Sequence, residues 1–312
     1  MPDPAIIAHG LSKAFEDVEA VRALDLKVGQ GEMFGLVGPD GAGKTTTIRL
    51  LCGILRPTSG TARVLGYDLG RQVDKIKENI GYLSQKFSLY GDLTVDENIE
   101  FFAEIHGVRG FRERREELLE FTRLKPFRRR LAGHLSGGMR QKLALACTLI
   151  HTPRLILLDE PTTGVDPVSR RDFWKILSGL LREGITIFMS TPYLDEAERC
   201  SSVGLMAEGR LTAVGSPREI KARMKGDVIE VVCADTRRAA KALKAAAGLG
   251  EVQVFGDRLH IVVANAARDA ARLTAVLSGA GVGPIEWRVI PPSLENVFIS
   301  LLKPAPLEVD HA

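Results

Sequence analysis

The chain has 312 residues and a mass of 34.0 kDa, about twice the usual length of one domain, which indicates one large domain with a smaller companion. This length excludes a disulfide-stapled miniprotein, and the balance of 45% hydrophobic and 26% charged residues argues against a disordered chain. The 42 basic and 39 acidic residues leave a net charge of +3, so composition gives no reason to expect a nucleic-acid partner.

Residues 5–215 alternate short β-branched runs with helical patterns. The first part, IIAHGLSKAF and then VRALDLKVGQGE, alternates apolar and polar residues and predicts an antiparallel flank. Helical periodicity across 93–151 predicts an inserted helical subdomain. Continuous apolar runs predict buried strands at 32–38, 154–160, 184–190 and 202–209. The alternation as a whole favours an α/β fold with a mainly parallel sheet.

The composition changes after residue 225. The patterns that follow indicate a strand, a helix, two strands, a helix and a strand, which predicts a small α+β domain centred on 227–302. The final stretch, LKPAPLEVDHA, has two prolines and no periodicity, so we expect it to fray. The predicted division is therefore 1–225 and 226–312.

No apolar run approaches the roughly 18 residues that cross a bilayer, and the opening MPDPAIIAHG lacks a basic flank before a hydrophobic stretch. We therefore expect a cytosolic chain. Its four cysteines show no metal-ligand spacing, which predicts reduced and mostly packed thiols. They are Cys52, Cys147, Cys200 and Cys233.

A loop reading GPDGAGKT begins at Gly38, between a predicted strand and a predicted helix, and satisfies the pattern GxxxxGK[ST]. Gly38, Gly41 and Gly43 let backbone N–H groups turn toward one anion, and the helix start adds its positive end. Lys44 is expected to bridge the β- and γ-phosphates, and Thr45 to give a hydroxyl to Mg²⁺. The candidate nucleotide contacts are Gly38, Pro39, Asp40, Gly41, Ala42, Gly43, Lys44, Thr45 and Thr46.

Two carboxylates follow the apolar run LILL, at Asp159 and Glu160. Burial of that strand places both at its carboxyl end, where open α/β sheets bind ligands. Asp159 suits the Mg²⁺ shell, and Glu160 suits polarisation of an attacking water. Without the phosphate loop, the same residues would more simply be an acidic turn before Pro161.

The element LSGGMRQK at 135–142 resembles the signature of ABC transporter ATPases. It lies at a predicted helix N-terminus, which is physically a second anion site. In that family the signature clamps the γ-phosphate held by the opposite subunit. The resemblance therefore implies nucleotide contacts from Ser136, Gly137, Gly138 and Gln141, with a simple helix cap as the alternative.

Further motifs stand at the spacing of this family. Phe15 in LSKAF matches the aromatic residue that the family stacks on adenine, although a lone aromatic on a strand packs in a core about as often. Gln85 in GYLSQKFSLY resembles the loop that joins Mg²⁺ to the membrane partner, which implies a catalytic residue and a metal ligand beside Thr45 and Asp159. TGVDP, ending at Pro167, resembles the loop that signals across the dimer.

The resemblance covers about residues 5–225, and the C-terminal part with PPSLENVFISLL looks like the extension of drug-exporting ABC ATPases of the daunorubicin-resistance type. GPDGAGKTT and LSQKFSLYGDLTVDEN look closest to one half of a tandem ATPase of bacterial multidrug efflux. These likenesses imply ATP and Mg²⁺ as cofactors. They also imply permease membrane subunits and a second ABC ATPase subunit as partners, no nucleic acid, and a position on the inner face of the cell membrane.

The sequence departs from the family where a histidine usually contacts the γ-phosphate after the strand GITIFMS. Pro192 stands there, and no histidine occurs between His151 and His260. Proline offers neither an imidazole nor a backbone N–H, so the loss is expected to cost roughly 3 to 4 kcal/mol, about 10² to 10³ in rate. We therefore hypothesise a slow site on this chain, whose signature completes an active site on another subunit. Asp40, where the family commonly has Asn, gives no reason to expect inactivity.

The leading interpretation is the ATP-hydrolysing subunit of an ABC exporter that dimerises head to tail on ATP. The alternative is a regulatory subunit that binds ATP with little hydrolysis beside a catalytic ABC subunit. A soluble ABC ATPase of DNA repair or translation is a third reading, but the sequence has neither a coiled-coil insertion nor a second cassette.

Two surface features have competing interpretations. The apolar residues near Gln85 predict a groove for the permease, or else part of the core. They are Phe87, Tyr90 and Leu93. The basic runs at 112–115 and 128–130 have acidic residues close by, which favours a solvated helix face over lipid or nucleic-acid contact.

Overall fold

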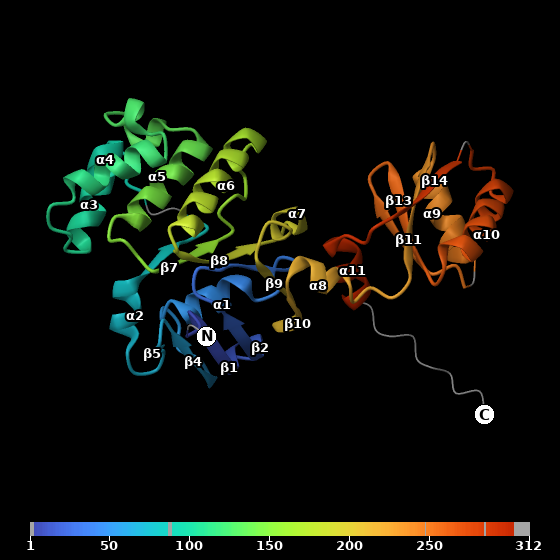
Figure 1. Ribbon diagram of the computed structural model, residues 1–312, viewed down its shortest axis with the longest axis horizontal. Coiled ribbons are helices and arrows are strands. Elements are labelled where there is room, and N and C mark those ends of the chain that lie inside the picture. Colours follow the sequence, from blue (N-terminus) through green and yellow to red (C-terminus); the bar gives the residue numbers. More distant parts are fainter. Residues whose placement is uncertain (1–2, 87–88, 247, 284, 303–312) are drawn as a thin grey trace. The chain divides into compact units, whose positions relative to one another are not determined.

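A computed structural model describes residues 3–86, 89–246, 248–283 and 285–302 (Figure 1). The chain divides into two compact units, Met1–Val214 and Gly215–Ala312. The second unit begins before the division predicted at 225, because α8 (Pro217–Lys221) packs against α11 (Leu294–Leu302).

The first unit opens with an antiparallel sheet, as the alternating pattern predicts. Its strands are β1 (Ile6–Phe15), β2 (Val18–Val28), β4 (Ser59–Val64) and β5 (Tyr67–Asp68), in the order β2-β1-β4-β5. Inward residues such as Ile6, Leu11 and Val21 are fully buried. This sheet supplies the wall that faces the phosphate loop.

A six-stranded sheet forms the centre of the first unit. Its strands are β3 (Met33–Val37), β6 (Ile80–Leu83), β7 (Leu155–Asp159), β8 (Thr186–Thr191), β9 (Ser202–Ala207) and β10 (Arg210–Gly215), in the order β10-β9-β3-β8-β7-β6. The run β9-β3-β8-β7-β6 is parallel, and every residue of β3, β7 and β8 is buried. Burial on both faces explains their continuous apolar sequences. The parallel sheet predicted from the sequence is confirmed.

Aromatic packing fixes the middle of this sheet. Phe34 on β3 stacks on Phe188 of β8, with ring centroids 5.2 Å apart and planes 11° from parallel. Both rings are fully buried. Because β3 and β8 are held in this register, the loops that leave their carboxyl ends are also held beside one another.

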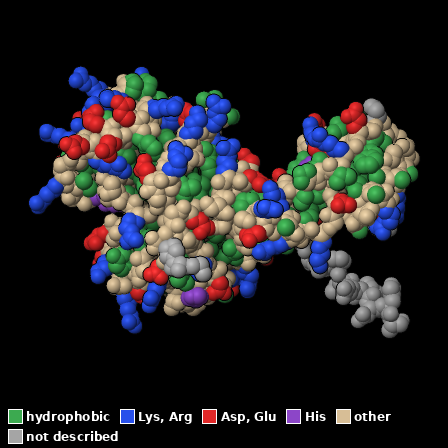
Figure 2. All heavy atoms as spheres, in the orientation of Figure 1, with side chains coloured by type: hydrophobic (Ala, Val, Ile, Leu, Met, Phe, Trp, Pro, Cys, Tyr) green, Lys and Arg blue, Asp and Glu red, His purple; other side chains and the backbone are tan. Residues whose placement is uncertain are grey.

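Three helices form the predicted insertion: α3 (Val95–Ile105), α4 (Arg112–Phe121) and α5 (Gly137–Leu149). Thr94 begins α3 with a capping box that includes Glu97. Arg128 joins α3 to α4 through bonds of 2.8 Å to Asp96 and 2.7 Å to Glu116. Basic and acidic side chains are interspersed over these helices (Figure 2), so this arginine run belongs to a solvated, ion-paired face.

The remaining helices of the first unit are α1 (Lys44–Leu51), α2 (Val73–Asn79), α6 (Pro167–Arg182) and α7 (Leu194–Ala197), with short 3₁₀ turns at Lys125–Phe127 and Ala132–His134. No helix within the described ranges is long and apolar enough to cross a lipid bilayer. All four cysteines are free, as predicted, and burial raises the pKa of the Cys200 thiol to about 12.

The second unit has the predicted α+β order. Strands β11 (Asp227–Cys233), β12 (Glu251–Phe255), β13 (Arg258–Val263) and β14 (Ile285–Ile290) form an antiparallel sheet in the order β12-β13-β11-β14. Helices α9 (Thr236–Ala245) and α10 (Ala266–Gly279) pack on one face through a core that includes Ile229, Leu259 and Leu273.

Candidate functional site

The loop from Gly38 to Thr45 connects β3 to α1. Gly43 is the N-cap of α1, with a left-handed φ of 103°, and a Cβ there would lie 2.3 Å from the carbonyl oxygen of Ala20. A Cβ at Gly38 would lie 2.1 Å from the carbonyl oxygen of Met206. The two glycines therefore let the loop pack tightly between β2 and β9, which is the close backbone approach expected of an anion-binding loop before a helix.

Lys44 is folded back into this loop. Its Nζ donates to the carbonyl oxygens of Gly38 at 2.9 Å and Pro39 at 3.0 Å. The same Nζ lies 3.2 Å from Oε1 of Glu160, and only 3% of the lysine side chain is exposed. A buried ammonium at the centre of a glycine-rich loop suits an anionic ligand, because neighbouring water screens it little.

Asp159 ends β7 beside the start of α1. Its Oδ1 accepts hydrogen bonds from Thr45 Oγ1 at 3.0 Å and from Ser190 Oγ at 2.7 Å. Its Oδ2 is buried and has no hydrogen-bond partner, and burial raises the pKa of this carboxyl group. An unsatisfied carboxylate oxygen beside a threonine hydroxyl is a donor set that hard divalent cations prefer, so these residues fit Mg²⁺.

Asp159→Asn is expected to stabilise the metal-free protein. Because the folded-state pKa of Asp159 is raised, the ionised carboxylate costs stability above that pKa, and the cost is relieved as the pH falls through it. Asparagine removes the charge, so the melting temperature at neutral pH should rise by roughly 2 to 4 °C, with a flatter acid dependence. Thermal unfolding in EDTA measures this. A lower melting temperature than that of the wild type would contradict the assignment of an uncompensated charge.

Glu160 follows directly in a strained conformation, with a φ of 48° that non-glycine residues seldom adopt. Its backbone N–H donates to the carbonyl oxygen and Oγ of Ser190, at 3.2 and 3.0 Å. Its Oε2 accepts from Gln85 Nε2 at 3.1 Å and Thr163 Oγ1 at 3.3 Å. Strand β8 thus holds the strained backbone in place, and the side chains of Gln85 and Thr163 hold the carboxylate beside Lys44. Such a strained residue is typical of a functional site.

One cleft of about 620 Å³ brings most of these residues together, although Gly38 and Asp159 are not part of its lining. From the sequence-predicted set the lining includes Asp40, Gly41, Gly43, Lys44, Thr45, Thr46, Gln85, Glu160 and Pro192. Ala42 is buried behind the loop, and Pro39 contributes its carbonyl oxygen. Ala20, Thr163 and Tyr193 also line the cleft, and the sequence reasoning missed them. Thr163 and Tyr193 stand next to motif residues in the sequence, and this adjacency could have identified them. Ala20 has no such neighbour.

Phe15 lies outside the lining of this cleft. It is the last residue of β1, its ring is 45% exposed, and Lys13 Nζ lies 5.0 Å from the ring centroid. The ring is therefore not part of a core. Its proposed contact with adenine stays a prediction.

The signature residues also lie apart from the cleft lining. Ser136 caps α5 by accepting the backbone N–H of Met139 at 3.3 Å. A Cβ at Gly138 would lie 2.3 Å from Ser169 Oγ, so the helix start packs closely on α6. Gln141 is buried with an unpartnered Nε2, while Ser136 and Gly137 are exposed. An exposed, capped helix start is thus available to a phosphate brought by another chain.

Pro192 and Tyr193 follow β8 at the mouth of the cleft. A buried polar cluster anchors this loop, since Glu196 accepts from Thr162 Oγ1 at 2.6 Å and from Thr191 Oγ1 at 2.8 Å. The guanidinium of Arg170 lies 4.6 Å from the Tyr193 ring centroid. Pro192, where the family resemblance predicts a histidine, is therefore followed by a firmly held loop.

The segment after Gln85 is tied to α3. Asn98 is fully buried, and its Nδ2 donates to the carbonyl oxygens of Tyr90 at 3.0 Å and Leu93 at 3.2 Å. Tyr90 is 46% exposed and packs edge-on against Phe101, whereas Leu93 is half-buried. Phe87, the remaining predicted groove residue, lies outside the described residues.

Comparisons with known proteins agree with this geometry. The family model described as ABC transporter matches residues 21–163, and the model described as ATP-binding protein DrrA1-3-like, C-terminal domain, matches residues 215–302. The chain therefore belongs to the family of ABC transporter ATP-binding proteins, which are ATPases coupled to transport.

Individual relatives refine this likeness. The chain is 36% identical over 306 residues to the daunorubicin resistance ATP-binding protein DrrA3 of Streptomyces coeruleorubidus, covering 96% of both chains. It is 50% identical over 232 residues to the probable multidrug ABC transporter ATP-binding protein YbhF of Escherichia coli. The aligned residues make up 72% of this chain but only 40% of that protein.

Among solved structures, an ATP-binding cassette in a dimeric post-hydrolysis state bound to ADP and Pi matches with a TM-score of 0.62 and 25% identity. The match covers 68% of this chain and 98% of that one.

Proposed function

We propose that this chain binds and hydrolyses Mg·ATP as one of two cassettes that drive separate permease subunits of a drug exporter, at the cytoplasmic face of the membrane. One observation carries the proposal: Lys44, Thr45, Gln85 and Glu160 line a single cleft, and Asp159 is hydrogen-bonded to Thr45 at its wall. The names of the relatives support the exporter class, and the cargo would be recognised by membrane subunits outside this chain.

Each side chain has a distinct task in the proposed reaction. The loop N–H groups and Lys44 would bind the β- and γ-phosphates, and Thr45, Asp159 and Gln85 would hold Mg²⁺. Bound there, Mg²⁺ would neutralise charge on the phosphates. Glu160, aimed by Gln85 and Thr163, would accept hydrogen bonding from the attacking water and orient it toward the γ-phosphate.

The signature would act in trans. Ser136 and Gly137 are exposed at the start of α5 and are absent from the cleft lining, so a second cassette is needed to bring such a helix start to the bound phosphate. The dimeric structure bound to ADP and Pi supports this arrangement. Whether the second cassette is a copy of this chain or a different one is left to experiment.

Mixing two inactive variants tests the trans arrangement. Lys44→Ala removes the phosphate lysine of one chain, and Ser136→Arg blocks the signature of the other. In a head-to-tail dimer only the mixed pair keeps one intact composite site, so a one-to-one mixture should recover about a quarter of wild-type hydrolysis, since half of the dimers are mixed. Each variant alone should be inactive. No recovery in the mixture, with both variants folded, would contradict a trans site between two copies of this chain.

A second candidate function rests on Pro192. Because this residue offers no donor to the γ-phosphate, the chain would serve mainly to hold ATP beside a catalytic partner. The two candidates predict different products after incubation of the purified chain with Mg·ATP: steady release of phosphate for the first, and retained ATP with almost no phosphate release for the second.

A further inference from the structure

The second unit has an exposed sheet edge at β14. Within the described part of the chain this strand pairs only with β11, and it ends the order β12-β13-β11-β14. Trp287 and Val289 on this strand are 45% and 53% exposed. The unpaired backbone groups of an edge strand are a template for pairing with another strand, and exposed apolar side chains on it mark an interaction surface.

The two faces of β14 differ in chemistry. Trp287 stands opposite Val231, and Val289 opposite Ile229, so both lie on the face where α9 and α10 pack. The side chains between them, Glu286 and Arg288, lie on the other face, where Arg288 is opposite Glu230. Apolar residues therefore line one face of the edge and opposite charges the other.

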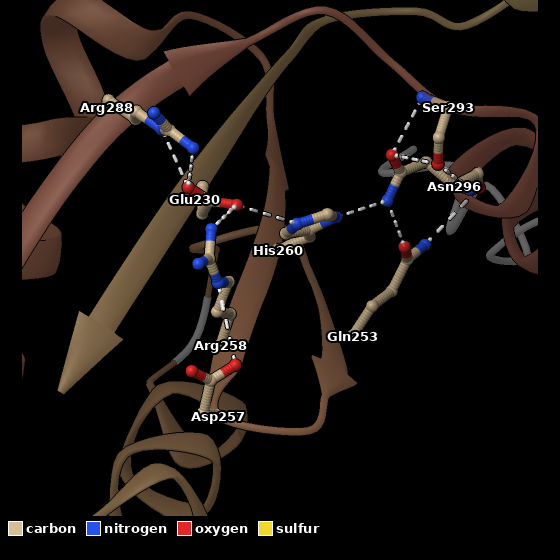
Figure 3. A network of polar contacts seen from close by, with 8 residues as sticks. All are labelled: Glu230, Gln253, Asp257, Arg258, His260, Arg288, Ser293 and Asn296. Atoms are coloured by element: carbon tan, nitrogen blue, oxygen red, sulfur yellow. Dashed lines mark hydrogen bonds and ion pairs between the residues drawn. The ribbon is translucent and has the colours of Figure 1, made fainter. Parts of the chain in front are cut away.

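Arg288 is held in place although its side chain is 66% exposed. Its Nε and Nη2 each lie 2.7 Å from Oε1 of the buried Glu230, as Figure 3 shows. Arg258 Nη1 lies 3.2 Å, and His260 Nε2 3.5 Å, from the other carboxylate oxygen. Although burial alone would raise the pKa of Glu230, hydrogen bonds from these arginines hold it below its usual range. The network presents Arg288 as a fixed cation at the edge.

Glu286 lies on the same face of β14 as Arg288, two positions earlier. Together with Trp287 and Arg288 it lines an open hollow of about 330 Å³ on the sheet. One acidic and one basic residue thus stand two positions apart on one face, on either side of Trp287. Such a strand is complementary to itself when a copy runs antiparallel to it.

We propose that two copies of this chain associate through β14 about a two-fold axis at Trp287, joining their C-terminal sheets into one of eight strands. Glu286 of each copy then faces Arg288 of the other, on the face away from α9 and α10. Trp287 faces Trp287, and Ile285 faces Val289, on the opposite face. These are the cross-strand pairs that stabilise antiparallel sheets.

The charges also select this register. Successive side chains of β14 alternate between the two faces of the sheet. A two-fold axis perpendicular to the sheet therefore pairs residues of the same face across the joint only when the axis passes through a residue. Moving the axis to residue 286 places Glu286 opposite its own copy, and moving it to residue 288 does the same for Arg288. Like charges directly opposite are unfavourable, so only the axis at Trp287 combines apolar and charged complementarity.

This association is independent of nucleotide, unlike the ATP-driven contact between cassettes. A six-residue edge is small beside a standard interface, so we expect a weak dimer with a dissociation constant of about 10 µM. Sedimentation velocity of the full chain in EDTA without nucleotide, from about 1 to about 100 µM, brackets that value.

Glu286→Arg should weaken association by about tenfold or more, because Arg288 then meets a like charge. Val254→Lys, on the opposite edge strand β12, is the matched control and should leave it unchanged.

Mixing variants tests the register. Arg288→Glu alone should also give monomers, whereas a mixture of Glu286→Arg with Arg288→Glu restores opposite charges in both pairs and should restore the dimer. If Arg288→Glu fails to fold beside Glu230, Trp287→Cys replaces it: a short bismaleimide should join residue 287 to its own copy, while Val254→Cys should not react in this way.

Three results would overturn the proposal. The wild type would stay monomeric at all concentrations, or Val254→Lys would weaken association as much as Glu286→Arg does, or residue 287 would form no crosslink to its own copy. Binding of Mg·ATP by Glu286→Arg should equal that of the wild type, so failure here remains distinct from failure of the nucleotide site.

Discussion

Glu160→Gln is expected to lower steady-state hydrolysis of Mg·ATP by about 10³ while leaving its binding nearly unchanged. The amide keeps the size of the side chain, and its oxygen can still accept from Lys44 once Gln85 turns its own amide oxygen toward the new N–H groups. It lacks the negative charge that polarises an attacking water. ATP should then persist in the site, so a dimer should accumulate in Mg·ATP and be visible by size-exclusion chromatography.

A matched control for this substitution is Glu183→Gln. Glu183 is the exposed C-cap of α6 and contributes nothing to the cleft lining, so this variant should hydrolyse ATP as the wild type does. If Glu160→Gln kept the wild-type rate, another group would have to orient the water, and the assignment of Glu160 would be wrong.

Lys44→Ala is expected to weaken binding of Mg·ATP by about 10² or more, because the loop loses the one buried ammonium that we propose binds the phosphates. The same change removes the 3.2 Å partner of Glu160 inside the protein. Leaving one member of a buried ion pair costs on the order of 3 kcal/mol, so the free energy of unfolding should also fall.

The double variant Lys44→Ala with Glu160→Gln separates these two effects. Neutralising Glu160 removes the unpaired charge, so thermal unfolding should return toward the wild-type midpoint, whereas isothermal titration with Mg·ATP should still show weak binding. Recovery of binding in the double variant would mean that Lys44 acts only through stability.

The phosphate loop and the carboxylate pair could be predicted from the sequence because both are short local motifs. GPDGAGKT joins a strand to a helix, and LILLDE ends a buried strand, so short-range geometry already sets their conformations. The sheet rule placed Asp159 at a ligand-binding edge, and both Thr45 and Asp159 were predicted to hold Mg²⁺. Their direct contact, across 114 positions, came from the structure.

Other features depend on packing between distant elements, which no local pattern encodes. Ala20 reaches the cleft because Gly43 packs against its carbonyl group, and Asn98 holds the segment after Gln85 through bonds that only the folded chain reveals. Phe15 had the right residue type for stacking, yet its place at the end of β1 lies beyond the cleft lining. The register of β14 likewise became visible only once β11 had fixed its two faces.

Pro192→His tests most directly the proposal that Pro192 slows an otherwise complete hydrolytic cleft. Phosphate release is measured for the wild type and the variant, each alone and with a second ABC cassette of the same transporter. We predict slow turnover by the wild type alone, a rise of about 10² in the variant, and activation by the partner. Brisk Glu160-dependent turnover by the wild type alone, unchanged by histidine at 192, would contradict it.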